Sequence, residues 1–277
     1  LDAANNPIPG FTRDDCVPFN GDSTRHVLQW KTEAFPETFL EEDKKVRFYL
    51  KEADLYSYLP DQATGPVAVI YDPGAGGGRL ADDAAIPDRS RFRASGDRSG
   101  FKLARQGDLV YLDLHSDAAL KTNACYFRDA TWTDDTDWCV EGWFRIVDQG
   151  TEPNYGFATF FRPDRGRTAA IYLSDKAAGI LSSQGTVHEV LQNVPMDTTD
   201  AFHWYRLVHA GGEQGTVSLY VDGKQVATVP YEKLFPRYDR GHNVGFGPNA
   251  GHREGRMHVA RFGYRLGSTD VLLGPIE

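Results

Sequence analysis

The side chains that could do chemistry cluster in one alternating stretch of the sequence. His203, Tyr205 and His209 recur with a period of two, so a strand would place them on one face. Arg206 would fall on the other face. His and Tyr can abstract or donate a proton, and Arg can neutralise the carboxylate of a uronate, so His203, Tyr205 and Glu141 are candidate catalytic residues. The alternative is an ordinary inner strand whose His nitrogens bond to backbone groups.

A pair of carboxylates for glycosidic hydrolysis is incomplete in the sequence. Glu52 and Asp54 supply the first two acids of an E-x-D-x-x-E pattern, but Ser57 stands in the third place. A retaining mechanism would therefore lack its proton donor on this stretch. Glu141 is equally compatible with an ion pair to Arg145 or to another arginine of a sheet.

Sugar binding requires other residue types, and the predicted loops and strand ends contain them. Sugar rings stack their C–H faces on aromatic side chains, while polar side chains hydrogen-bond the hydroxyls. The alternative is that these aromatic rings only cover neighbouring strands. The candidate ligand-binding residues are Trp132, Tyr155, Arg162, Arg165, Tyr238, His242 and His252.

An acidic cluster follows Trp132 in the sequence TWTDDTDW. Asp134, Asp135 and Asp137 offer the oxygen ligands that Ca²⁺ prefers. An EF-type pattern is missing, so a solvated turn is the alternative. Ca²⁺ is the one metal that the sequence suggests, and no cofactor is required by the chemistry considered above.

The elements that would position these residues are short strands. Residues 202–229 predict three consecutive antiparallel strands, with a tight hairpin at Asp222-Gly223 in which Gly223 has positive φ. Such strands with Gly, Pro and Asp between them predict an all-β antiparallel β-sandwich of jelly-roll type. Further strands are expected at 67–71, 109–114, 124–127, 138–146, 157–161, 169–173, 179–181, 188–191, 243–247 and 257–264.

Composition and charge exclude several classes of partner. The net charge is −9, which leaves no basic field for nucleic acid or for an anionic membrane surface. No run of about 20 apolar residues is present, so membrane insertion is not expected. The sequence begins at Leu1 without Met, as expected of a processed piece of a longer precursor.

Three cysteines are too few for a disulfide-dense scaffold. Cys125 and Cys139 flank two strands that are predicted as neighbours; one alternative is a disulfide between them, and the other is two free buried thiols. Cys16 remains unpaired in either case.

Two segments resemble known families. The hairpin LYVDGKQVAT, after a strand rich in His and aromatic residues, resembles the concanavalin A-like and laminin-G-like β-sandwich superfamily, which includes lectins, adhesion modules, glycosidases and lyases. The segment VRFYLKEADLYSY resembles β-sandwich modules attached to glycoside hydrolases of the five-bladed propeller type. The resemblance implies a β-sandwich in carbohydrate biology.

The sequence therefore predicts residues 65–277 as the sandwich, with residues 1–64 as a strand segment packed on it or extending it. The expected function is carbohydrate recognition, or an accessory role in a secreted or periplasmic carbohydrate-active protein, with an oligo- or polysaccharide partner. A parent catalytic domain or a protein partner is a further expectation. One alternative is a glycoside hydrolase or polysaccharide lyase with its active site in the sandwich cleft, and another is a protein-adhesion module.

Overall fold

The computed structural model describes residues 7–8, 12–18, 31, 67–74, 78–83, 91–95, 98–117, 124–130, 136–148, 156–162, 167–184, 187–236, 243–248 and 255–274. The chain divides into two units, Leu1–Pro60 and Asp61–Glu277. In the first, Asp15 Oδ2 accepts hydrogen bonds from the amide and the hydroxyl of Thr12, at 3.0 and 2.7 Å. Most of residues 1–64 lie outside the described residues, so the predicted boundary and the strand segment before it stay predictions.

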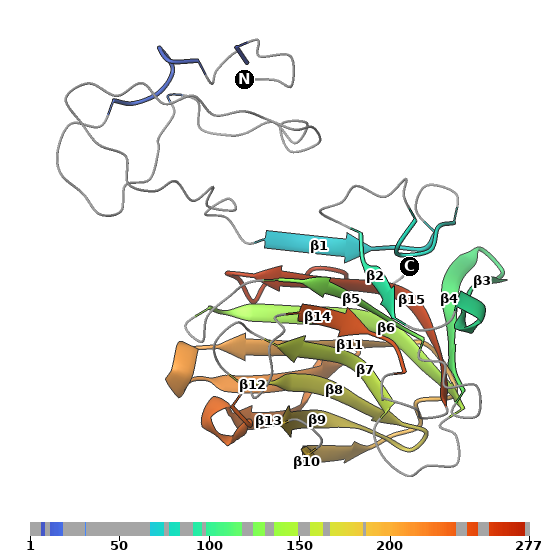
Figure 1. Ribbon diagram of the computed structural model, residues 1–277. Helices are drawn as coiled ribbons and strands as arrows, with labels where there is room; N and C mark the ends of the chain where they lie inside the picture. Colours follow the sequence, from blue (N-terminus) through green and yellow to red (C-terminus); the bar gives the residue numbers. More distant parts are fainter. Residues whose placement is uncertain are drawn as a thin grey trace. The chain divides into compact units, whose positions relative to one another are not determined.

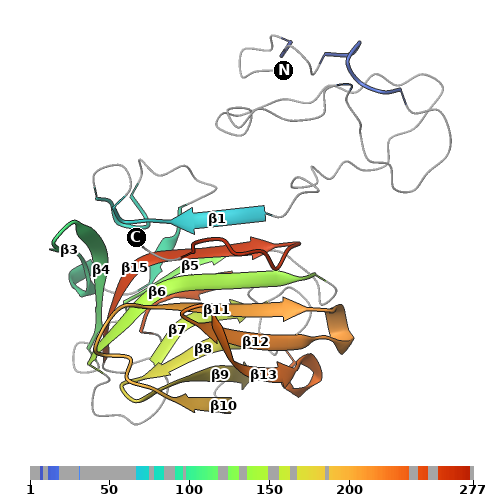
Figure 2. The same cartoon turned by 180° about the vertical axis from the view of Figure 1, so that it is seen from behind.

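The second unit is built from two antiparallel sheets (Figures 1 and 2). One sheet, which faces the viewer in Figure 2 and which we call the front sheet, has eight strands, in the order β13-β12-β11-β6-β15-β4-β3, with β1 paired to β15 outside this order. Their bounds are β1 (Val67–Tyr71), β3 (Phe101–Gln106), β4 (Leu109–Ser116), β6 (Trp138–Asp148), β11 (His203–Ala210), β12 (Thr216–Val221), β13 (Lys224–Pro230) and β15 (Gly255–Leu266).

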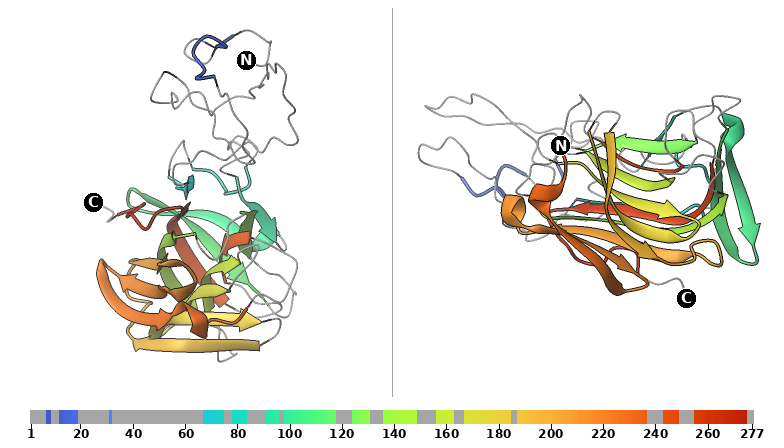
Figure 3. Two further views of the ribbon diagram at one scale, coloured as in Figure 1. Left: turned by 90° about the vertical axis from the view of Figure 1, so that its left-hand side faces the viewer. Right: turned by 90° about the horizontal axis from the view of Figure 1, so that it is seen from below.

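The back sheet has seven strands, in the order β10-β9-β8-β7-β14-β5-β2. Their bounds are β2 (Arg93–Ser95), β5 (Cys125–Asp129), β7 (Gly156–Arg162), β8 (Ala169–Ser174), β9 (Ala177–Gln184), β10 (Val187–Pro195) and β14 (Asn243–Phe246). Three short 3-10 turns, η2 (Arg98–Gly100), η3 (Gly212–Gln214) and η4 (Tyr231–Lys233), connect strands. Two further views show the layers from the side and from below (Figure 3).

Aromatic side chains join the two sheets in the core. Phe246 of the back sheet and Phe262 of the front sheet are both fully buried, with ring centroids 4.4 Å apart. Phe92 contacts both rings edge-on, at 5.3 and 5.6 Å. Burying a large aromatic ring stabilises the folded state by about 2 kcal/mol or more, so this cluster holds the layers face to face. The unit is therefore an all-β antiparallel sandwich, as the sequence predicts.

Every strand that the sequence predicts after residue 66 is present, and β2 and β3 are additional. The hairpin of β12 and β13 has φ of 49° at Asp222 and 80° at Gly223, which confirms the predicted turn. Such a turn matches the twist of the strands that it joins. Among the residues that the structure describes, no helix is long and apolar enough to cross a bilayer.

Candidate functional site

The predicted catalytic residues do not converge on one site. Arg206 pairs with Glu141 across β11 and β6, and Tyr205 pairs with Gly142. Neighbouring residues of a strand point to opposite faces, so Tyr205 faces the core while Glu141 faces away from it. Tyr205 is fully buried and stacks on Phe144 at 6.0 Å. Burial and nearby carboxylates hold the pKa of the Tyr205 hydroxyl well above its usual range, so it stays protonated.

His203 is held between two carboxylates at the edge of β11. Its Nδ1 lies 2.7 Å from Asp222 Oδ2, and its Nε2 lies 3.0 Å from Asp200 Oδ1. Burial lowers the pKa of the imidazole, but the hydrogen bonds to Asp222 and Asp200 outweigh it and the net change is upward. Because carboxylate oxygens engage both ring nitrogens, the imidazole has no nitrogen free to face a substrate, so this geometry does not present a general base.

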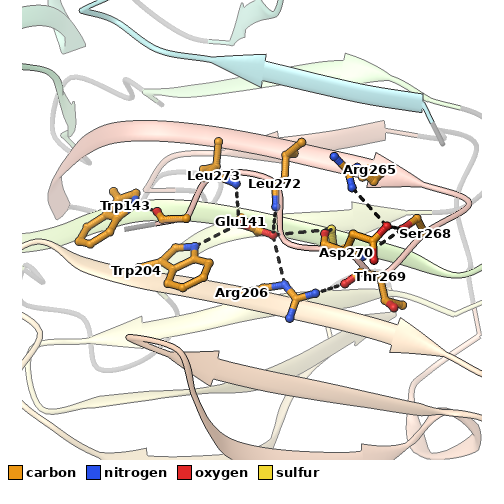
Figure 4. Close-up of polar contacts among 12 residues, drawn as sticks. Glu141, Trp143, Trp204, Arg206, Arg265, Ser268, Thr269, Asp270, Leu272 and Leu273 are labelled. Carbon is orange, nitrogen blue, oxygen red and sulfur yellow. Dashed lines mark hydrogen bonds and ion pairs between the residues drawn. The ribbon is translucent and has the colours of Figure 1, made fainter. Parts of the chain in front are cut away.

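The Glu141 carboxylate is buried and accepts hydrogen bonds from four N–H groups, and the Cys139 thiol lies 3.9 Å from its Oε1 (Figure 4). Two come from side chains of the front sheet, Arg206 Nε to Oε1 and Trp204 Nε1 to Oε2, each at 3.1 Å. Two come from backbone amides, Leu272 to Oε1 at 2.8 Å and Leu273 to Oε2 at 2.9 Å. The expected arginine pair is Arg206 rather than Arg145. Glu141 thus ties residues 268–274, which we call the return segment, to the front sheet.

Further contacts fix the return segment on the outer face of the front sheet, the face turned away from the back sheet. Gly267, with φ of 84°, follows β15 at the start of the return. The Trp143 indole donates to the carbonyl oxygen of Gly274 at 2.9 Å, and Arg206 donates to that of Thr269. A Cβ added to Gly263 would lie 2.8 Å from Leu272 Cδ2, so glycine permits the close approach of that side chain. Glu141 therefore occupies a structural position.

A second group of polar and aromatic side chains lies on the same outer face, farther along the strands. We call it the outer-face patch. His258 of β15 pairs in register with Asp113 of β4 on one side and with Arg145 of β6 on the other. The Tyr111 ring lies 4.4 Å from the His258 ring and 5.5 Å from Phe202. The patch consists of Tyr111, Asp113, Arg145, Phe202, Arg256 and His258.

Charge within the patch is unevenly compensated. Arg256 holds both oxygens of Asp113, with Nε to Oδ1 at 2.7 Å and Nη2 to Oδ2 at 2.6 Å. Burial raises the pKa of Asp113, but the hydrogen bonds and charge of Arg256 outweigh it and the net change is downward. Arg145 contacts the Phe202 ring at 5.8 Å, and its buried Nε has no hydrogen-bond partner among the described residues. Arg145 is therefore the guanidinium of the patch that has no carboxylate partner among the described residues.

His258 is neutral at physiological pH. Burial, aided by the charges of Arg145 and Arg256, lowers the pKa of His258 to about 4, although Asp113 opposes the change. Its Nε2 lies 3.6 Å from Asp113 Oδ1, too far for a good hydrogen bond, and its Nδ1 has no partner among the described residues. The patch therefore combines aromatic faces, a guanidinium without a carboxylate partner and a buried imidazole nitrogen without a hydrogen-bond partner among the described residues.

The remaining predicted site residues lie mostly outside the described part of the chain. Asp137 is described, and its carboxylate accepts a hydrogen bond from the Gly211 amide at 2.9 Å. The described residues hold no group of three ligands for a metal. Arg162 ends β7, but nothing of its side chain is described. The residues outside the description are Trp132, Asp134, Asp135, Tyr155, Arg165, Tyr238, His242 and His252.

The disulfide alternative is wrong. Cys125 lies on β5 of the back sheet and Cys139 on β6 of the front sheet, and both are reduced. The two strands follow one another along the chain but belong to different layers, so they are not neighbours. Cys139 Sγ lies 3.4 Å from the carbonyl oxygen of Asp270 in the return segment.

The sequence interpretation missed the outer-face patch. The alternating runs that contain Tyr111 and Asp113 on one strand and Arg256 and His258 on another are visible in the sequence. Polar residues at alternate positions of a half-buried strand are the signal that could have identified its members. Their meeting depends on which strands pair and in which register, and alternation does not give that.

No family model and no curated protein sequence matches this chain. The fold is similar to that of a carbohydrate esterase from the Shiga toxin-encoding bacteriophage phi24B, with TM-score 0.51, 11% identity, and coverage of 74% of this chain and 100% of that one. Cip1, a cellulose-induced protein, gives TM-score 0.48 at 15% identity over 71% of this chain and 100% of its own. The binding domain of Paraclostridial Mosquitocidal Protein 1 gives TM-score 0.47 at 8% identity over 65% and 45%. At such identities, the likeness to the phage protein shows that the chain shares an antiparallel β-sandwich fold.

Proposed function

We propose that this chain is a carbohydrate-binding β-sandwich module that holds an oligosaccharide on the outer-face patch. The observation that carries the proposal is the half-buried pair of rings, Tyr111 and Phe202, beside the uncompensated guanidinium of Arg145. The carbohydrate esterase named above supports a setting in carbohydrate biology only by analogy of fold.

The patch has the residue types that a sugar surface needs. The apolar C–H face of a pyranose ring stacks on an aromatic ring, while guanidinium and carboxylate groups hydrogen-bond its hydroxyls. Strands fix Tyr111, Asp113, Arg145 and His258, so ordering the site costs little entropy on binding. A shallow surface leaves much of the sugar solvated, so we expect dissociation constants of about 10 μM to 1 mM.

Titration calorimetry against a panel of oligosaccharides tests this proposal with two variants, Tyr111→Ala and Phe202→Ala. We expect each to weaken binding about 10-fold or more, since each removes a stacking face. Phe127→Ala is the matched control, because Phe127 is a half-buried ring on β5 of the back sheet. Unchanged binding in both patch variants, with weakened binding in the control, would place the site elsewhere.

An elimination reaction at the same patch is a second candidate function. The observation behind it is the Nδ1 of His258, which has no partner among the described residues and would accept a proton in the tautomer that carries its hydrogen on Nε2. Burial lowers the pKa of His258 to about 4, which weakens it as a base. The Tyr111 hydroxyl would protonate the leaving oxygen, and Arg145 would hold the uronate carboxylate. Release of unsaturated sugars from a polyuronate, abolished in His258→Gln with the fold intact, would establish it. Absence of such products from every polyuronate would leave binding alone.

The broader setting belongs to the same proposal. We propose a secreted or periplasmic protein of concanavalin A-like type, in which the sandwich serves as an accessory module. The predicted sugar contacts Trp132 and Arg162 remain part of the proposal, and Arg162, which ends β7 of the back sheet, would belong to a binding surface separate from the outer-face patch. Trp132→Ala is expected to weaken glycan binding while leaving the melting temperature nearly unchanged. A protein ligand for the same face is the alternative, and competition by free oligosaccharide distinguishes the two.

A further inference from the structure

We infer that Arg145 and His258 together form a subsite for a sugar carboxylate, so that the module prefers uronate-containing glycans over neutral ones. The inference rests on the proposed function and adds the class of ligand. It depends on two adjacent polar groups of the front sheet whose hydrogen-bonding capacity the described residues leave unused.

Arg145 is the first of these groups. It is half-buried on β6, its Nε is buried without a partner among the described residues, and its guanidinium lies over the Phe202 ring, 5.8 Å from the ring centre. The other arginines on this face differ, since Arg206 is paired with Glu141 and Arg256 with Asp113. A partly desolvated guanidinium without a carboxylate is costly, and an incoming carboxylate would repay that cost with charge-assisted hydrogen bonds.

His258 supplies the second polar atom. It is the register partner of Arg145, and its buried Nδ1 has no hydrogen-bond partner. An imidazole that carries its proton on Nδ1 would donate to an oxygen held by the guanidinium. Two donors from neighbouring strands of one sheet are rigidly placed, which is the arrangement that fixes the orientation of a bound group.

The surrounding charges favour an anion at this place. Asp113 Oδ1 lies 3.6 Å from His258 Nε2, and Arg256 neutralises this carboxylate through two hydrogen bonds. Lys102 pairs in register with Asp113 on the far side and adds positive charge there. The whole chain has a net charge of −9, which repels polyanions, so binding of an acidic glycan needs a specific cationic site.

A carboxylate matches the Arg145 guanidinium in shape as well as in charge. The planar guanidinium presents N–H groups in a fixed fork that matches the two oxygens of a carboxylate. The rings of Tyr111 and Phe202 flank the two donors, so a pyranose could stack there with its carboxylate on Arg145.

The test compares three ligands: an oligogalacturonate, the same oligomer after chemical reduction of its carboxylates, and a sulfated dextran. We expect the oligogalacturonate to bind about 10-fold or more tightly than its reduced form, because charge-assisted hydrogen bonds are lost on reduction. Arg145→Gln should bring the two affinities together, with little change for the reduced oligomer. Arg93→Gln is the control, since Arg93 is an exposed back-sheet arginine paired with Asp129. It should keep the full preference.

The outcomes separate the two proposals. Equal affinity for acidic and reduced oligomers, both lost in Tyr111→Ala, would overturn the carboxylate subsite and keep the sugar-binding function. Binding of neither oligomer would overturn the proposed function itself. Sulfated dextran bound as tightly as oligogalacturonate would show attraction to charge rather than to a carboxylate. Arg145→Lys keeps the charge but lacks the fork, so it should retain only part of the preference; an undiminished preference in both Arg145→Gln and Arg145→Lys, at a wild-type melting temperature, would also count against the subsite.

Discussion

Glu141 Oε1 lies 2.8 Å from the amide nitrogen of Leu272, a residue 131 positions later in the chain. The bond joins the middle of β6 to the return segment after β15, and Arg206 donates to the same oxygen at 3.1 Å. A buried carboxylate that accepts from two backbone amides and two side chains determines where the return segment lies. Two indole N–H groups are satisfied in the same region: that of Trp143 donates to the carbonyl oxygen of Gly274, and that of Trp204 donates to Glu141 Oε2.

Glu141→Gln tests how much this arrangement stabilises the fold. The amide cannot accept at both ends, and it turns its own N–H groups toward donors, so we expect a loss of about 3 kcal/mol in the free energy of unfolding. Urea denaturation measures it, with Glu189→Gln as the control because Glu189 is exposed on β10. Proteolysis within the return segment should also accelerate. A loss no larger than that of the control would contradict the structural role.

Gly223→Val tests the hairpin of β12 and β13. Gly223 has φ of 80°, and its nearest neighbour to an added Cβ is Trp204 at 3.9 Å, so space is not limiting. Valine at this φ strains the backbone, so we expect the free energy of unfolding to fall by about 1 to 3 kcal/mol. Gly223→Asn should cost less, because Asn tolerates the left-handed region. Thermal denaturation of the two variants distinguishes strain from crowding, and equal stability of Val and wild type would refute the turn.

The pH dependence of stability tests His203. Folding raises its pKa above 6.5 through Asp222 and Asp200, in spite of burial. A group whose pKa rises on folding stabilises the native state fully below its unfolded pKa, and the contribution disappears as the pH rises through the folded value. The stability difference between wild type and His203→Gln should therefore be larger at about pH 6 than at about pH 9. A difference that does not change with pH would show that the imidazole is not charged.

Thiol titration tests the state of the cysteines. Denatured protein without reductant should show three thiols, because Cys16, Cys125 and Cys139 are all reduced. Burial, with the charge of Glu141, raises the pKa of Cys139 to about 12, so in native protein this thiol should react much more slowly than Cys16, which is only partly buried. A count of one thiol would restore the bridge between the sheets.

The strands could be predicted because alternation and turn chemistry act locally. The Asp222-Gly223 hairpin needs only residues that tolerate positive φ between two alternating runs. The strand β15 shows where this reasoning stops. Met257 and Val259 face the core, and so do Phe262 and Tyr264, because a register shift between Val259 and Arg261 reverses the alternation.

The candidate site could not be predicted because it depends on pairing over long distances in the chain. Asp113, Arg145 and His258 become neighbours only when β15 lies between β4 and β6, and a slip of one residue would turn each side chain to the other face. Glu141 shows the same limit. A glutamate on a strand is a candidate catalytic acid, but nothing near Glu141 in the sequence indicates that the amides of Leu272 and Leu273 donate to its carboxylate.

The pairing of β1 with β15 has a consequence for protein architecture. Val67 and Leu266, the outer residues of the first and last strands of the sandwich, are register partners. Antiparallel partners lie about 5 Å apart, so the first strand of the sandwich begins where the last strand ends. The chain does not leave the sandwich there, because the return segment runs back over the front sheet as far as Gly274, which accepts a hydrogen bond from Trp143. A circular permutant that keeps the contacts of Glu141 therefore needs a linker that joins Val67 to Gly274 rather than to Leu266, with new termini in an exposed turn.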